Sequence, residues 1–195
     1  MGCVKSKTPK KYEVVVENGV QVTKEVEVKV EEVLPASAHK KIIFLGNDYV
    51  GKTSIIRQYT EDTFEEYVPP TSIVSNFDKT IETAGPNGKP MKLRLQIWDS
   101  PGEDTYRNIR KNFFQGSQAI VIVYDVTCSK SFKEVSSHLS DVQEVCQTNV
   151  PVIIVGTKSD LADARKVSFK NLADLAAKIK AKHSVVDYFE VSSIA

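Results

Sequence analysis

The segment GNDYVGKT, residues 46–53, follows directly on the apolar run KIIFL, residues 41–45. It matches the phosphate-loop pattern G-x-x-x-x-G-K-T, and apolar residues recur at helical spacing over residues 55–59. In such a loop the glycines let backbone N–H groups curve around phosphates, and the helix that follows adds its positive dipole end. Residues 41–59 therefore predict a strand, a phosphate-binding loop and a helix.

Two more apolar runs rich in β-branched residues, at 119–124 and 152–155, have the pattern of strands buried on both faces of a parallel sheet. Each is followed by apolar residues at helical spacing, over 132–146 and 169–179. A serine precedes each of these stripes as a candidate N-cap, namely Ser129 and Ser168. The alternation of strand and helix predicts an α/β layered fold.

Residues 73–83 and 91–98 interrupt this alternation, because both read as strands and the turn sequence GPNG, residues 85–88, joins them. This arrangement predicts an antiparallel hairpin at an edge of the sheet. The expected fold is a three-layer α/β fold of the P-loop NTPase type, with a mostly parallel sheet and one antiparallel edge hairpin.

The composition narrows the class of protein. A chain of 195 residues with 41% hydrophobic content supports one compact domain and a tail. The net charge of +1 gives no electrostatic footprint for nucleic acid, so we expect no nucleic-acid partner. The three cysteines, Cys3, Cys128 and Cys146, are too widely spaced for a disulfide framework and favour a reduced, intracellular compartment. No apolar run approaches the roughly 20 residues of a membrane-spanning helix.

The amino-terminal region is organised by charge. Residues 1–11 carry a charge of +4, whereas residues 12–34 carry −4 from six glutamates and two lysines. Most valines of residues 12–33 fall on even positions around an Asn18-Gly19 dipeptide, which is typical of a hairpin with one apolar and one charged face. A solvated linker is an equally good interpretation. We expect a basic leader at 1–11, an acidic spacer at 12–38 and a globular domain at 39–195.

Further motifs follow the phosphate loop. Phe64 and Thr71 lie seven residues apart after it, and three short segments stand at the ends of predicted strands: WDSPGE at 98–103, TKSD at 157–160 and EVSS at 190–193. In this order these motifs resemble those of the Ras superfamily of small GTPases, closest to its Rab and Ras branches. The resemblance covers residues 39–195.

The resemblance implies a switch protein of membrane trafficking or signalling that binds GTP or GDP with Mg²⁺. The positions it places around the nucleotide are Gly46, Asp48, Tyr49, Val50, Gly51, Lys52, Thr53, Ser54, Phe64, Thr71, Gly102, Thr157, Lys158, Asp160, Ser192 and Ser193. It assigns Thr53, Thr71 and Asp99 to the metal, and Lys52 and Glu103 to catalysis. Expected partners are effector, exchange-factor and activating proteins. The stretch from Tyr67 to Thr71 is one residue longer than in Ras and Rho proteins, which leaves the register of this switch loop open.

Several residues depart from the family pattern. Glu103 stands where most members have the glutamine that orients the attacking water, and an ionised carboxylate can accept but not donate a hydrogen bond. Asp48 and Tyr49 are bulky where many relatives have small residues, and Ile194 replaces a lysine. We therefore expect slow GTP hydrolysis, with a pseudo-GTPase scaffold as the alternative. Relatives continue into a final helix, so ending at Ala195 predicts a missing last helix and a truncated chain.

The first residues, MGCVKS, fit the pattern for N-myristoylation at Gly2, with Cys3 as a candidate for palmitoylation. One acyl chain binds membranes only marginally, so a second chain and nearby basic residues are needed for stable attachment. The basic residues of the leader are Lys5, Lys7, Lys10 and Lys11. We expect the protein at the cytoplasmic face of a membrane, plasma or endosomal.

Overall fold

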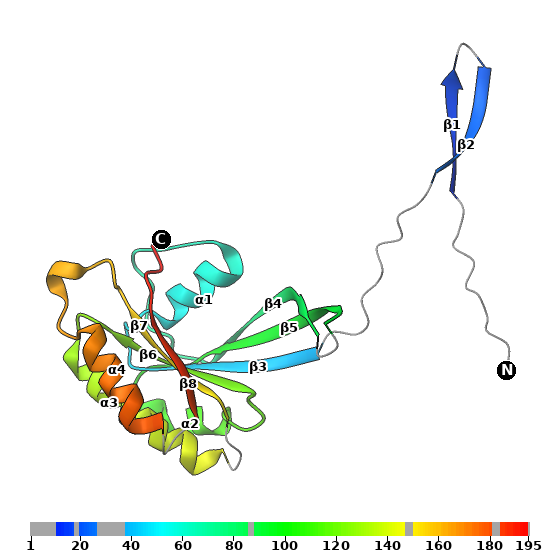
Figure 1. Cartoon of the computed structure of the whole chain (residues 1–195). Helices are drawn as coiled ribbons and strands as arrows, with labels where there is room; N and C mark the ends of the chain where they lie inside the picture. Colours follow the sequence, from blue (N-terminus) through cyan, green and yellow to red (C-terminus); the bar gives the residue numbers. More distant parts are fainter. Residues whose placement is uncertain are drawn as a thin grey trace, which may run out of the picture. The chain divides into compact units, whose positions relative to one another are not determined.

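The computed structural model describes residues 11–17, 20–26, 38–85, 88–146, 150–180 and 184–194. The chain divides into two units, Met1–Pro35 and Ala36–Ala195, and each is described by itself (Figure 1). None of the helices in the described ranges has the length and apolar character that crossing a membrane requires.

The first unit contains one antiparallel strand pair, β1 (Lys11–Glu17) and β2 (Val20–Val26). Of the two interpretations of this region, the structure therefore contains the hairpin. Its register places Val14 opposite Thr23 and Val15 opposite Val22, so even positions of one strand face odd positions of the other.

The second unit is built on a six-stranded sheet of order β4-β5-β3-β6-β7-β8. All neighbouring pairs are parallel except β4 with β5, which confirms the antiparallel edge hairpin. The strands are β3 (Ala38–Leu45), β4 (Ser75–Ala84), β5 (Pro90–Asp99), β6 (Ala119–Asp125), β7 (Val152–Thr157) and β8 (Val185–Glu190). The first strand of this unit begins one residue before the expected start of the domain.

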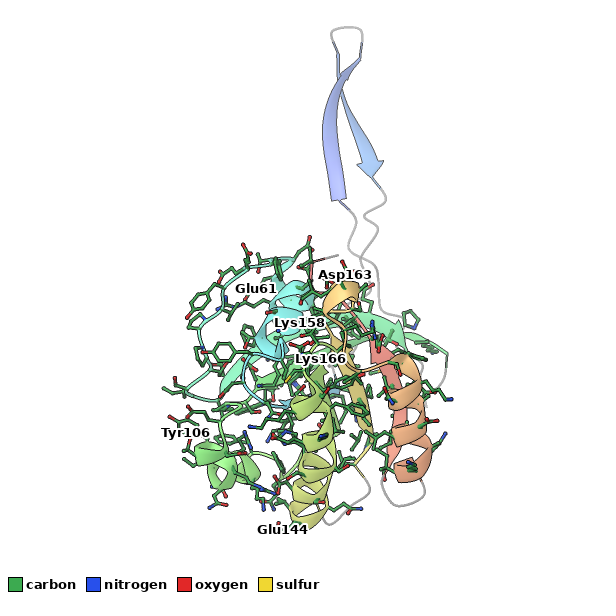
Figure 2. All side chains as sticks on the ribbon, turned by 90° about the vertical axis from the view of Figure 1, so that its left-hand side faces the viewer. Glu61, Tyr106, Glu144, Lys158, Asp163 and Lys166 are labelled. Atoms are coloured by element: carbon green, nitrogen blue, oxygen red, sulfur yellow. The ribbon has the colours of Figure 1, made fainter. Side chains whose placement is uncertain are left out.

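Four α-helices occur in the described residues: α1 (Lys52–Glu61), α2 (Arg107–Asn112), α3 (Ser129–Val145) and α4 (Phe169–Lys180). The helix α1 covers one face of the sheet, and α3 and α4 cover the other, which confirms the three-layer α/β fold (Figure 1). Figure 2, in which Tyr106 and Glu144 are labelled, shows α2 beside α3. Within the described residues, which end at Ile194, no helix follows β8.

The core follows the alternation of side chains along the strands. Ile120, Ile122 and Tyr124 of β6 point into the layer that α3 and α4 cover, whereas Val121 and Val123 point to the other face. Both sets are buried, which explains why this strand reads as a continuous apolar run.

The first residues of the helices show which N-caps could be predicted from the local sequence and which could not. Ser168 and Asn171 exchange hydrogen bonds at the start of α4, so Ser168 caps this helix as expected. The N-cap of α3 is Cys128 and not Ser129, and the hydroxyl of Ser131 donates to the carbonyl of Cys128. The helix α2 has only six residues and no apolar stripe that could have predicted it.

Candidate functional site

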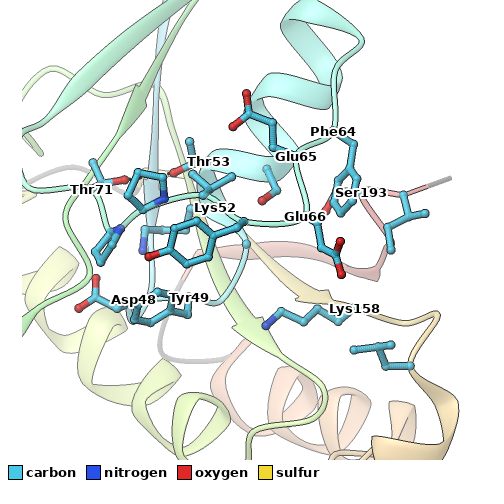
Figure 3. A pocket seen from close by; sticks show the side chains of 18 of the residues that line it. Asp48, Tyr49, Lys52, Thr53, Phe64, Glu65, Glu66, Thr71, Lys158 and Ser193 are labelled. Atoms are coloured by element: carbon cyan, nitrogen blue, oxygen red, sulfur yellow. Dashed lines mark hydrogen bonds between the residues drawn. The ribbon is translucent and has the colours of Figure 1, made fainter.

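A pocket of about 380 Å³ opens at the edge of the sheet where β3, β7 and β8 end. Loops at the carboxyl ends of parallel strands meet at such an edge, which is where α/β proteins bind ligands. Eleven of the expected nucleotide-binding residues line it: Asp48, Tyr49, Gly51, Lys52, Thr53, Ser54, Phe64, Thr71, Lys158, Asp160 and Ser193. Figure 3 shows Lys52, Thr53 and Thr71 at one end of the pocket and Phe64 and Ser193 at the other.

The loop between β3 and α1 depends on glycine at its first position. A Cβ atom on Gly46 would lie 2.2 Å from the carbonyl oxygen of Val123, so no larger residue fits. Gly51 has φ 87°, a conformation that glycine adopts without strain. Tyr49 also has a positive φ, 60°, and its side chain is 62% exposed at the mouth of the pocket. An aromatic side chain therefore stands on the rim of the loop in a backbone conformation that usually favours glycine.

Lys52 is the buried cation of the loop. It is only 5% exposed, and its Nζ donates hydrogen bonds to the carbonyl oxygens of Gly46 at 2.9 Å and Asn47 at 2.7 Å. Burial lowers the pKa of Lys52 to about 8, although the negative charges of Asp99 and Asp48 oppose this shift. A buried ammonium group at the bottom of a pocket is suited to binding phosphate oxygens.

Three oxygen-bearing side chains from separate elements converge beside Lys52. The Thr53 hydroxyl donates to Oδ2 of Asp99 at 2.6 Å, and the Thr71 hydroxyl donates to the same oxygen at 3.2 Å. The two hydroxyl oxygens are 3.1 Å apart. The structure thus brings Thr71 to this cluster despite the extra residue after Tyr67.

The chemistry of this cluster fits Mg²⁺. Hydroxyl and carboxylate oxygens are the ligands that this hard cation prefers. Oδ1 of Asp99 is buried without a hydrogen-bond partner, and burial raises the pKa of this carboxyl group, partly opposed by its hydrogen bond from Thr53 and the charge of Lys52. An unpartnered buried carboxylate oxygen next to two hydroxyl groups is what a cation site requires.

The far end of the pocket combines apolar side chains with two carboxylates. Phe64, Leu161 and Ile194 line the pocket and are exposed, and Glu65 and Glu66 lie close to Phe64 (Figure 3). Lys158 lies between the two ends, and its Nζ pairs with Oδ2 of Asp125 at 2.7 Å. This combination of apolar side chains with the carboxylate of Asp160 suits a flat heterocycle that carries hydrogen-bond donors.

Some expected site residues do not line this pocket. Thr157 is 1% exposed, and its hydroxyl donates to the carbonyl oxygens of Val50 at 2.6 Å and Tyr124 at 3.1 Å. This side chain therefore holds the phosphate loop in place from behind. The hydroxyl of Ser192 accepts a hydrogen bond from the amide of Ile194.

Gly102 and Glu103 line a second pocket, which also includes Val50 and shares Asp48 and Tyr49 with the first pocket. A Cβ atom on Gly102 would lie 2.2 Å from the amide nitrogen of Asp48, so this glycine packs directly on the phosphate loop. The carboxylate of Glu103 accepts a hydrogen bond from the Thr105 hydroxyl at 2.9 Å.

Sequence reasoning missed three side chains that support the site. Glu134 of α3 accepts a hydrogen bond from the side-chain amide of Asn47 in the phosphate loop. Arg165 forms a bidentate ion pair with Glu190 at 2.8 and 2.9 Å, which joins the loop after β7 to the end of β8. Arg110 of α2 holds the backbone around Gly102. None of the three belongs to a short motif, so only the pairing of distant segments shows them.

Comparison with known proteins agrees with this geometry. The family model described as "Ras family" matches residues 41–194, which is most of the chain. The chain belongs to the Ras family. The match confirms the resemblance seen in the motifs, and members of this family bind GTP and GDP with Mg²⁺.

Relatives within the Ras family point to its Rab branch. The chain is 36% identical to Ras-related protein RabC of Dictyostelium discoideum, over 78% of this chain and 74% of that protein. It is 31% identical to GTP-binding protein ypt4 of Schizosaccharomyces pombe, over 76% and 64%, and 34% identical to human Ras-related protein Rab-30, over 66% and 61%. The matched part thus spans less than two thirds of the length of the latter two relatives.

Proposed function

We propose that this chain is a membrane-anchored GTP switch that binds GTP and GDP with Mg²⁺ and hydrolyses GTP slowly. The observation that carries the proposal is the convergence of Lys52, Thr53 and Thr71 at one end of the pocket, with Phe64 at the other end (Figure 3). Asp99 lies behind the two threonines and accepts a hydrogen bond from each hydroxyl. A site with a buried ammonium group, a cation site and a slot for a base has the parts that a Mg²⁺-nucleotide complex needs.

Each residue at the phosphate end of the pocket has a proposed role in binding the phosphates or Mg²⁺. Lys52 binds the β- and γ-phosphates, Thr53 and Thr71 donate their hydroxyl oxygens to Mg²⁺, and Asp99 holds the ion through water. Mg²⁺, when bound, neutralises charge on the phosphate oxygens. Because Thr71 belongs to the loop between α1 and β4, its attachment to the metal site makes this loop sensitive to the γ-phosphate.

The base lies between Phe64 and the apolar pair Leu161 and Ile194, where Asp160 accepts two hydrogen bonds from guanine. Adenine lacks this pair of donors and leaves the carboxylate unsatisfied. Titration with fluorescent GDP, with ATP as competitor and with or without Mg²⁺, tests this assignment. We expect submicromolar, Mg²⁺-dependent binding that ATP does not displace, and displacement by ATP would contradict it.

Slow hydrolysis follows from the residues beside the phosphate end. The Glu103 carboxylate cannot donate a hydrogen bond, and like Asp48 it adds negative charge near the γ-phosphate. Glu103→Gln restores a side chain that can both accept from water and donate. We expect this variant to hydrolyse bound GTP about tenfold faster in single-turnover assays.

Glu82→Gln is the matched control, because Glu82 is an exposed glutamate on the edge hairpin, 71% exposed and 3.9 Å from Lys92. It should leave the rate unchanged. A fast natural protein with a slower Glu103→Gln variant would overturn the proposal of slow turnover.

A scaffold without turnover is the second candidate. It is favoured by Asp48, whose carboxylate lines both pockets next to the phosphate loop, where an incoming triphosphate adds further negative charge. This candidate predicts that the protein holds GDP or no nucleotide and that Glu103→Gln restores no hydrolysis.

The leader supplies the membrane part of the proposal. Gly2, Cys3, Lys5, Lys7 and Lys10 lie outside the described residues, and Lys11 is the first residue of β1. Acylation of the leader and its membrane binding are therefore proposed from the sequence pattern alone. Several relatives carry Rab names, which is in keeping with a place at the cytoplasmic face of a membrane. The loops that hold Thr71 and Glu103 are the proposed contacts for effector, exchange-factor and activating proteins.

A further inference from the structure

Arg110 is a buried arginine whose side chain donates hydrogen bonds to backbone carbonyl groups and not to a carboxylate. It lies in α2, is 3% exposed, and its Nη1 donates to the carbonyl oxygen of Pro101 at 2.7 Å and to that of Glu103 at 3.2 Å. The two carbonyl groups flank Gly102. One guanidinium group therefore holds the backbone on both sides of the glycine that packs on the phosphate loop.

Ordinary packing does not explain an arginine here. Among the described residues, the ion pairs of α2 are made by Arg107 and Lys111, and none includes Arg110. Burial lowers the pKa of Arg110, and the charges of Asp104 and Asp141, which form no ion pair with it, oppose this shift only in part. A neutral side chain would fill the same space without the cost of burying a charge. The presence of a guanidinium group is thus best explained by its hydrogen bonds, which hold the carbonyl groups of Pro101 and Glu103.

The hydrogen bond from Arg110 to the carbonyl group of Pro101 also sets the direction of the Gly102 N–H group. The carbonyl group of Pro101 and the N–H group of Gly102 belong to one planar peptide unit, in which they point in opposite directions. A donor that fixes the carbonyl oxygen therefore also aims the Gly102 N–H. The contact of Gly102 with the amide of Asp48 places this peptide unit at the phosphate loop.

The helix that carries Arg110 is itself anchored. Arg107 donates two hydrogen bonds to one oxygen of Asp141, at 3.0 Å from Nε and 2.6 Å from Nη2, and Lys111 pairs with Glu144 at 2.6 Å. Both acids belong to α3, which packs on the sheet. The position of Pro101 is consequently fixed relative to the core through α2 and α3.

We propose that Arg110 is a positioning residue for recognition of the γ-phosphate, because it holds Pro101 and so aims the Gly102 N–H at the third phosphate. The inference rests on the proposed function, in which Gly102 meets the γ-phosphate. The inference predicts that Arg110 contributes to the binding of GTP but not of GDP, because GDP has no γ-phosphate for the Gly102 N–H group to meet.

The test compares the affinities of Arg110→Gln and Arg110→Lys for GDP and for a non-hydrolysable GTP analogue. We expect Arg110→Gln to weaken binding of the analogue by about tenfold and of GDP by less than about twofold, which corresponds to the loss of one well-placed hydrogen bond. Arg110→Lys keeps the charge but loses the fork that spans two carbonyls, so it should fall between. Hydrogen exchange of the Gly102 amide in the nucleotide-free protein should accelerate in both variants.

Arg94→Gln is the matched control, because Arg94 pairs with Asp78 on the exposed edge hairpin, and it should change neither affinity. Equal weakening of GDP and analogue in both Arg110 variants would show a structural role alone and overturn the inference. The inference would also be overturned if the ratio of the affinities for the analogue and for GDP, and the hydrogen exchange of the Gly102 amide, both stayed as in the natural protein. Failure of the natural protein to bind either nucleotide would instead overturn the proposed function itself, and the exchange experiment would still report whether Arg110 holds the loop.

Discussion

At the scale of the residue, Lys52 couples nucleotide binding to pH. Its pKa is about 8 in the free protein because of burial, and bound phosphates raise it by adding negative charge. The ammonium form is therefore nearly complete below about pH 7 in both states, whereas above pH 8 binding has to take up a proton. We expect the affinity for GDP to be flat below about pH 7, to bend near pH 8 and to fall by up to about tenfold per pH unit above it. Titrations between pH 6.5 and 9.5 measure this slope.

Calorimetry in two buffers of different ionisation enthalpy supplies the control. Near pH 8.5 the heat of GDP binding should depend on the buffer, and at pH 6.5 the Lys52 contribution should vanish. Affinity that stays level through pH 9.5 would show that Lys52 is not the group that changes charge.

His138 sets an acid limit on stability at the same scale. It is 6% exposed in α3, its Nε2 has no hydrogen-bond partner, and burial followed by the charge of Arg110 lowers its pKa to about 4. The unfolded chain has an ordinary histidine pKa near 6.5, so it binds more protons between these values. The stability contribution is complete above pH 6.5 and is lost as the pH falls towards 4, up to about 3 kcal/mol. Urea unfolding of the natural protein and His138→Gln at pH 7 and pH 4.5 should show a smaller acid loss in the variant.

At the scale of the element, Asp141 joins α2 to α3. It is buried, and although burial alone would raise the pKa of its carboxyl group, hydrogen bonds from Arg107 and Lys111 outweigh that effect and lower it. Asp141→Asn removes the acid of Arg107, whereas Lys111 keeps its pair with Glu144. We expect a loss of about 2 kcal/mol in the free energy of unfolding.

Asp78→Asn is the comparison for Asp141→Asn, because it removes the acid of a solvent-exposed ion pair. Asp78 pairs with Arg94 on the edge hairpin. Exposed pairs contribute little, so this change should cost less than about 0.5 kcal/mol. Similar losses in the two variants would show that the contact between α2 and α3 is not held by charge.

At the scale of the whole molecule, the proposed attachment to a membrane rests on two separate features of residues 1–11. The lysines carry +4 in total, and each basic residue near an anionic surface contributes ~1 kcal/mol. For the myristoylated chain, replacing all four lysines by glutamine should abolish the salt-sensitive part of binding to phosphatidylserine vesicles in sedimentation assays. Gly2→Ala, which prevents acylation, should remove the remainder. Equal binding of all three proteins would rule out anchoring by the leader.

The sequence alone determined the features that depend on neighbours along the chain. The apolar runs at 41–45, 119–124 and 152–155 could be interpreted as buried parallel strands because both faces of each strand need apolar side chains. The phosphate loop could be recognised because its glycines, its lysine and the adjoining helix act within eight residues. The edge hairpin was predictable for the same reason, since its turn residues lie between its strands.

Only the tertiary structure decided which distant residues meet. Thr157 holds Val50 across 107 positions in sequence, and no spacing rule could specify this contact. The meeting of Thr71 with Asp99, 28 positions apart, was expected only from the family resemblance and not from the spacing. Arg110 likewise acts through carbonyl groups that carry no sequence signal. The physical reason is that the order of the strands in the sheet and the packing of α2 against α3, and not local backbone preference, bring these groups within hydrogen-bonding distance.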